Sequence, residues 1–224
     1  MKAQDRWSAV EYYLAEKLLP SDAVLEAALK GSAAAKLPNI QITPLEGRFL
    51  YMLAAAIRAQ RILEIGTLGG YSTIWLARAL PADGQVVTLE IDPKHAAVAS
   101  ANIARAGLSS KVEVRVGPAL ESLAHLANRA NGPFDLAFID ADKQNNAAYF
   151  DWALKLSRPG SLIIVDNVIR DGAIVDAKAR DEMVQGVRRF FDRVAAEPRV
   201  HATALQTVGT KGYDGMAVLL VKTP

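Results

Sequence analysis

The stretch Leu63-Glu64-Ile65-Gly66-Thr67-Leu68-Gly69-Gly70-Tyr71-Ser72 decides the fold of this chain. It completes an apolar run that begins at Arg61 and leads into a helical pattern, which predicts the first strand-to-helix turn of an α/β protein. Glycines at such a turn let the backbone approach a ligand closely. The paired glycines of G-x-G-x-x-G are missing, which indicates a ligand without a pyrophosphate and disfavours a nicotinamide oxidoreductase.

The rest of the chain repeats this alternation of strands and helices. Apolar runs predict five parallel strands, at 61–65, 85–90, 112–116, 136–140 and 162–166. Helical patterns fill 72–79, 95–106, 119–128, 147–156 and 181–195. Segments 200–205 and 216–221 surround Gly209, Gly212 and Gly215, so we expect a closing antiparallel hairpin. Residues 1–60 are expected to form accessory helices, one capped by Ser21 and another covering 45–57.

Length and composition limit the classes of protein that remain. The 224 residues fit one α/β domain, with a helical cap at 1–60 and a core at 61–224. The 26 basic and 24 acidic residues nearly balance, so charge gives no reason to expect nucleic acid. Because cysteine is absent and the three histidines are scattered along the chain, any metal must be held mainly by oxygen. Neither a signal peptide nor a membrane span is visible, so we expect a cytoplasmic protein.

Two glutamates indicate the ligand of the glycine-rich turn. Glu90 ends the second predicted strand, where an acidic side chain can accept hydrogen bonds from both hydroxyls of a ribose. Glu64 lies inside the first strand end, where burying a carboxylate is costly unless it meets a cation or donors. A nucleoside without phosphates that carries an ammonium group fits both, as S-adenosylmethionine does. The alternative is a glycine-rich turn with another ligand or none.

Acidic and amide side chains gather where the fourth and fifth strands end. Asp140 ends the fourth strand, and Asp166 and Asn167 end the fifth. Neighbouring parallel strands open on one crevice, so these oxygen ligands suit Mg²⁺, Mn²⁺ or Ca²⁺. The alternative is that Asp166-Asn167 forms a turn and Asp140 caps a helix. Lys143 is a candidate base beside the cation, or else an ordinary solvated lysine.

Four blocks of sequence together resemble the cation-dependent O-methyltransferases of the catechol and caffeoyl-coenzyme A type. The resemblance runs from about Pro38 to the C-terminus. The blocks are Gln41-Ile42-Thr43-Pro44 with Glu46-Gly47-Arg48-Phe49-Leu50, the glycine-rich turn, Phe134-Asp135 through Asp140-Ala141-Asp142-Lys143, and Asp166-Asn167.

The resemblance implies a Rossmann-like, doubly wound sheet of seven mostly parallel strands, usually in a homodimer that binds S-adenosylmethionine. The implied acceptor is a small hydroxylated molecule, with a catechol-like vicinal diol as the default. Implied cofactor contacts are Ile42, Glu64, Gly66, Thr67, Ser72, Glu90, Ala119 and Asp140. Asp140, Asp166 and Asn167 would hold the cation, and Lys143 would take the hydroxyl proton with Asp140 beside it.

Two departures from the family pattern change what is expected of the adenine contact and of the methyl acceptor. Pro118 stands where many relatives carry an acidic residue, which leaves only the backbone of Ala119 for adenine. After Asn167 the chain has a short charged stretch in place of a long insertion, so a bulky thioester acceptor is not implied. Arg170, Tyr213 and Asp214 are expected at the pocket rim. Methylation of a hydroxylated nucleoside in tRNA and a non-catalytic cofactor-binding role remain alternatives.

Overall fold

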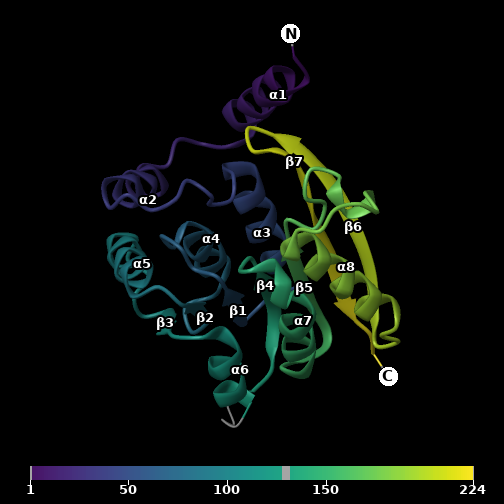
Figure 1. Ribbon diagram of the computed structural model, residues 1–224. Helices are drawn as coiled ribbons and strands as arrows, with labels where there is room; N and C mark the ends of the chain where they lie inside the picture. Colours follow the sequence, from purple (N-terminus) through teal and green to yellow (C-terminus); the bar gives the residue numbers. More distant parts are fainter. Residues whose placement is uncertain (1, 128–131, 224) are drawn as a thin grey trace. The chain divides into compact units, whose positions relative to one another are not determined.

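A computed structural model describes residues 2–127 and 132–223 (Figure 1). The sheet has seven strands in the order β3-β2-β1-β4-β5-β7-β6. Their bounds are β1 Arg61–Ile65, β2 Gln85–Glu90, β3 Val112–Val116, β4 Phe134–Ile139, β5 Ser157–Asp166, β6 Val200–Gly209 and β7 Gly212–Val221. The predicted seven-stranded sheet with a closing antiparallel hairpin is confirmed.

The chain divides into two compact units that do not follow the predicted boundary at residue 60. One unit is Leu14–Gly132, and the other joins Met1–Tyr13 to Pro133–Pro224. A single domain therefore stays a prediction. No helix in the described part of the chain is long and apolar enough to cross a membrane.

The unit Leu14–Gly132 contains the parallel strands β1, β2 and β3 and the helices that pack beside them. Its complete helices are α2 Ala23–Ala34, α3 Pro44–Ala56, α4 Tyr71–Ala79, α5 Pro93–Arg105 and α6 Ala119–Ala127. The predicted helix 119–128 ends on Asn128, which lies outside the described residues. Four of the five β1 residues are buried, as expected for a strand covered on both faces.

Two side chains fix where the early helices begin. Asp22 caps α2 by accepting hydrogen bonds from the amides of Val24 and Leu25, both at 3.1 Å. The prediction of Ser21 as this cap is therefore wrong by one residue. Thr43 begins α3 with a capping box in which Glu46 accepts from its amide, and Pro44 supplies the first helical residue.

The second unit is built on β4, β5, β7 and β6. β4 pairs with β5 in parallel, whereas β7 runs antiparallel to both β5 and β6. Helices α7 Asn146–Lys155 and α8 Glu182–Ala195 pack against each other, with α7 against β5 (Figure 1). Short 3₁₀ helices cover Lys143–Asn145 (η1) and Ala173–Val175 (η2), and α1 spans Ala3–Leu18.

Several strands are longer than predicted. β5 begins at Ser157 instead of Leu162, because Ser157 already pairs with Phe134 of β4, although Gly160 is left-handed with a φ of 85° and the register shifts before Leu136 pairs with Leu162. The hairpin strands continue until Gly209 pairs with Gly212, whose φ of 95° suits only glycine well. Near this hairpin, Gln4 of α1 donates to the carbonyl of Gly209 at 2.7 Å, and Glu11 accepts from the amide of Thr210.

Candidate active site

The glycine-rich turn connects β1 to α4 through three residues with left-handed backbone. Gly66, Leu68 and Gly70 have φ values of 97°, 49° and 78°. A Cβ at Gly70 would lie 3.3 Å from Ala99 of α5, so the turn and α5 are in close contact. The glycine at position 70 is therefore required both by backbone conformation and by space.

Glu90 holds this turn through its carboxylate. Its Oε2 accepts hydrogen bonds from the backbone amides of Thr67 at 3.1 Å and Leu68 at 2.8 Å, and its Oε1 accepts from Asp92 at 2.9 Å. The residue is 7% exposed. A carboxylate has about four acceptor positions, so one remains for a ligand hydroxyl. Glu90 thus stabilises the conformation of the turn and also presents an acceptor oxygen beside it.

Glu64 is fully buried at the end of β1 and is surrounded by hydroxyl donors. Ser72 donates to Oε1 at 2.6 Å, and Thr73 and Thr88 donate to Oε2 at 2.5 and 2.6 Å. Thr67 lies 2.6 Å from Thr88, completing a chain of hydroxyls. Because the only hydroxyl hydrogen of Thr88 goes to Glu64, Thr67 is the donor of that pair. A buried carboxylate was expected to meet a cation or hydrogen-bond donors, and around Glu64 the donors are hydroxyls of this chain.

Asn102 connects the turn to an accessory helix, and no sequence pattern predicted this contact. Its Nδ2 donates to the carbonyl of Gly69 in the turn at 2.9 Å and to Ala28 of α2 at 3.2 Å. Its Oδ1 accepts from Arg105 at 2.7 Å. The buried side-chain amide of Asn102 thereby fixes helix α2 to the backbone of the turn. This link can be recognised only from the structure.

The other expected cofactor contacts lie near these elements in the chain. Ile42 is buried just before α3, and Ala119 begins α6. At the carboxyl ends of β2 and β3, two apolar side chains are unexpectedly exposed: Ile91 at 71% and Val116 at 55%. Ligands of such sheets bind at the carboxyl ends of the strands, so exposed apolar residues there are a sign of a ligand site. The predicted strand boundaries already placed both residues at these ends.

The second unit brings together the acidic pair and the lysine. Ile139 pairs with Val165 in the parallel register of β4 and β5, so Asp140 and Asp166 leave neighbouring strands at the same level. Asp166 is 5% exposed and accepts a hydrogen bond from the amide of Asn167 at 2.7 Å. The Asn167 backbone is left-handed, with a φ of 57°.

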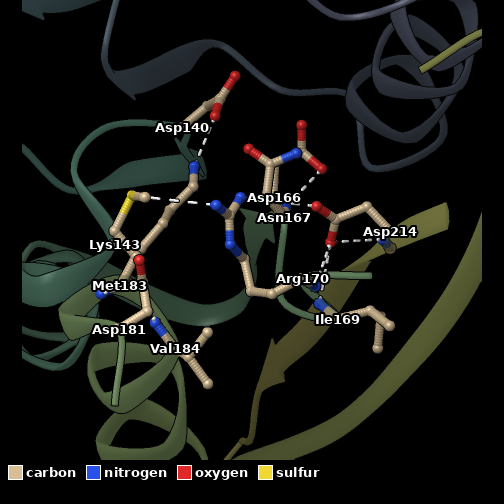
Figure 2. Close-up of polar contacts among 11 residues, drawn as sticks. Asp140, Lys143, Asp166, Asn167, Ile169, Arg170, Asp181, Met183, Val184 and Asp214 are labelled. Atoms are coloured by element: carbon tan, nitrogen blue, oxygen red, sulfur yellow. Dashed lines mark hydrogen bonds and ion pairs between the residues drawn. The ribbon is translucent and has the colours of Figure 1, made fainter. Parts of the chain in front are cut away.

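Lys143 lies in η1 and points back to Asp140 (Figure 2). Its Nζ donates to Oδ1 of Asp140 at 2.7 Å, and its side chain is 6% exposed. Helix α8 passes close by, because a Cβ at Gly186 would lie 2.3 Å from the Lys143 carbonyl oxygen. Lys143 is therefore not the ordinary solvated lysine of the alternative interpretation.

Asp142, one residue before Lys143, serves a different purpose. It accepts hydrogen bonds from Tyr149 and Asn145, each at 2.5 Å. Burial, reinforced by the hydrogen bond to Asp142, raises the pKa of Tyr149 well above its usual range. These contacts fix η1 to α7 and so set the position from which Lys143 extends.

The oxygen-rich set fits a hard divalent cation by its donor chemistry. Asp140 and Asp166 supply carboxylates and Asn167 an amide, with no sulfur ligand. Residues 2–127 and 132–223 contain no group of three or more His, Cys, Asp or Glu side chains that could hold a metal. The predicted set has only two carboxylates, so the cation remains a prediction.

The fold and the glycine-rich turn are those of Rossmann-like α/β proteins. The chain belongs to the O-methyltransferase family, whose family model matches residues 17–221. The predicted family and the predicted enzyme class, an O-methyltransferase, are thereby confirmed.

Proteins from several bacteria are similar to the whole chain. A catechol O-methyltransferase of Niastella koreensis is 52% identical over 216 residues, covering 96% of this chain and 98% of that protein. One of Mycobacterium tuberculosis is 53% identical, covering 95% of each. The structure of an O-methyltransferase from Bacillus cereus in complex with SAH matches with a TM-score of 0.96 and 57% identity, covering 97% of this chain and 99% of that chain.

Proposed function

We propose that this enzyme transfers the methyl group of S-adenosylmethionine to a hydroxyl of a catechol-like vicinal diol, with a divalent cation. The observation that carries the proposal is the buried Lys143–Asp140 contact beside Asp166 at two adjacent strand ends. Support also comes from relatives named catechol O-methyltransferase and from a similar chain, TomG of Streptomyces achromogenes, whose structure is in complex with SAM. That chain is 46% identical, with a TM-score of 0.96 and full coverage of both chains.

In this proposal the glycine-rich turn binds the nucleoside and amino-acid ends of the methyl donor. Glu90 would accept from the ribose at its remaining acceptor position, while its backbone contacts keep Thr67 and Leu68 in place. Ile42, Gly66, Ser72 and Ala119 are assigned to the donor by the family resemblance. Glu64 would act through the hydroxyls that it orients, Ser72 among them.

Asp140, Asp166 and Asn167 would hold the cation, and Asp140 would also face the donor. A bound divalent cation lowers the pKa of a coordinated hydroxyl and orients it. Lys143 would receive the hydroxyl proton at Nζ as the oxygen–carbon bond forms and the carbon–sulfur bond breaks. Its burial and its fixed contact with Asp140 position that nitrogen before the acceptor arrives, which is the kind of preorganisation that lowers a barrier.

The test is methyl transfer from labelled S-adenosylmethionine to catechol, with added Mg²⁺ or with excess chelator. Wild type, Asp166→Ala and Lys143→Ala are compared, and Lys30→Ala on an exposed face of α2 serves as a control. We expect turnover that needs the cation and is lost in the first two variants only. Cofactor binding without turnover on any diol would contradict the proposal.

The expected homodimer and the expected cytoplasmic location stay predictions. Sedimentation analysis tests whether the protein is a homodimer.

A further inference from the structure

Arg170 stands on an unusual piece of backbone directly after β5. Arg170, Asp171 and Gly172 have successive φ values of 55°, 54° and 78°. Non-glycine residues rarely adopt this left-handed conformation, and two in succession need surrounding contacts to hold them. Strained backbone of this kind is found most often at ligand sites.

Asp214 of β7 holds the loop in this conformation. Its Oδ1 accepts hydrogen bonds from the backbone amides of Ile169 at 2.9 Å, Arg170 at 3.0 Å and Gly215 at 3.0 Å (Figure 2). The amide of Asp171 donates to the carbonyl of Tyr213 at 3.1 Å. One oxygen of this partly buried carboxylate thus accepts hydrogen bonds from three backbone amides, which fixes the point from which the Arg170 side chain extends.

The Arg170 guanidinium itself is poorly satisfied. Its nearer carboxylate oxygen, Oδ2 of Asp214, lies 3.7 Å from one terminal nitrogen, beyond hydrogen-bond distance. Among residues 2–127 and 132–223, the other terminal nitrogen meets only the sulfur of Met183, at 3.9 Å. Within the described chain, the buried Nε has no hydrogen-bond partner. An arginine kept only for an ion pair would be expected to meet its carboxylate at shorter, bidentate distances.

The unsatisfied edge of this guanidinium lies close to the candidate active site. Arg170 follows Asn167 by three residues, and Met183 is three residues before Gly186, which contacts the backbone of Lys143. In Figure 2 the guanidinium lies between the side chains of Lys143 and Asn167. The Arg170 side chain is 26% exposed, and the N–H groups of its two terminal nitrogens form a fork that matches a carboxylate.

We propose that Arg170 binds a carboxylate on the methyl acceptor, so that the preferred substrate is a dihydroxylated aromatic acid. The diol would meet Asp140, Asp166 and Lys143, and the acid group would meet the terminal nitrogens of Arg170. This inference rests on the proposed function, because it assumes that the acceptor binds beside the acidic pair.

The test compares three acceptors of similar size: 3,4-dihydroxybenzoate, 3,4-dihydroxybenzyl alcohol and 3,4-dihydroxybenzylamine. Wild type is expected to prefer the acid by kcat/KM. Arg170→Gln should lower kcat/KM for the acid about 10- to 100-fold, mainly through KM, because a charge-assisted pair is lost. The alcohol should change less than about threefold. Arg170→Glu should reverse the order and favour the amine, whereas Lys155→Gln at the exposed end of α7 should change nothing.

Calorimetric binding of 3,4-dihydroxybenzoate, in the presence of S-adenosylhomocysteine, separates this inference from the proposed function. Binding that depends on Arg170 without methyl transfer to any acceptor would support a carboxylate site at Arg170 but overturn the proposed function, and with it the assignment of that site to a methyl acceptor. Methyl transfer with the same acid-to-alcohol ratio in wild type and Arg170→Gln would overturn the inference alone. Arg170→Lys keeps the positive charge, so its partial retention of acid preference would support a charge-based role over a structural one.

Discussion

The Nζ atom of Lys143 lies 2.7 Å from Oδ1 of Asp140, and the lysine side chain is almost completely buried. We expect Lys143→Met to lower kcat about 10²- to 10⁴-fold, the range for removal of a general base. The affinity for S-adenosylhomocysteine should stay within about threefold, because the glycine-rich turn is unchanged. Methyl-transfer assays measure kcat, and calorimetry measures the affinity for S-adenosylhomocysteine. An equal loss of both would argue against a role in proton transfer.

Glu64→Gln tests the hydroxyl cluster at the end of β1. The amide nitrogen of glutamine cannot accept, so at least one of Ser72, Thr73 and Thr88 loses its acceptor in a buried place. We expect the free energy of unfolding to fall by about 2–3 kcal/mol. Urea denaturation measures it. Ser72→Ala, which removes one donor and leaves the carboxylate and its threonine donors in place, should cost clearly less.

Asn102→Ala tests whether the link to α2 matters for the cofactor. Loss of the hydrogen bond to the Gly69 carbonyl should loosen the turn and raise KM for S-adenosylmethionine about 3- to 30-fold, with kcat less affected. Asp22→Asn is the control, because it weakens the ion pair of α2 with Arg78 without touching the turn. If the control raised KM equally, the effect would belong to α2 as a whole.

Gly186→Ala tests the close approach of α8 to η1. Alanine favours a helix over glycine by about 1 kcal/mol, but its Cβ would lie 2.3 Å from the Lys143 carbonyl oxygen and 2.4 Å from Gln144 Cα. Backbone on both sides must shift, so we expect a net loss of about 1–3 kcal/mol of stability together with lower kcat. Thermal unfolding and turnover measure these. Asp192→Ala, on an exposed position further along α8, should leave kcat unchanged.

Glu197 gives a pH dependence of stability. Hydrogen bonds from Arg199 and then Arg193 hold the pKa of its carboxyl far below the ordinary value of 4.5. Because the folded pKa is lowered, the stabilisation is fully present above about pH 5 and declines as pH falls below the ordinary value. Urea denaturation from pH 3 to 7 should show a gap between wild type and Glu197→Gln that narrows toward acid. A constant gap would contradict this linkage.

The strands were predictable because their signals are local. Apolar runs that contain Glu64 or lead up to Glu90, Asp140 or Asp166 combine a buried strand with a polar residue near its carboxyl end, which few other patterns imitate. The cap of α2 was misplaced because Ser21 and Asp22 both suit a cap, and only the hydrogen-bond geometry separates them.

The contacts that organise the site were not predictable, because they join residues far apart in the chain. Thr73 and Thr88 resemble ordinary helix and strand residues, yet both donate to Glu64. Asn102 looks like a solvent-facing helix residue in its segment. The left-handed backbone of Arg170 and Asp171 has no glycine signal and depends on Asp214, 44 residues later than Arg170.

The attachment of the first helix to the last hairpin sets an order of events during synthesis. Gln4 and Glu11 leave the ribosome first, but the backbone groups that they contact, at Gly209 and Thr210, come 205 and 199 residues later. At about 5–20 residues per second, this delay is roughly 10–40 s. Until then α1 has no hairpin to bind, so a chain stopped before residue 209 would carry an unattached N-terminal helix.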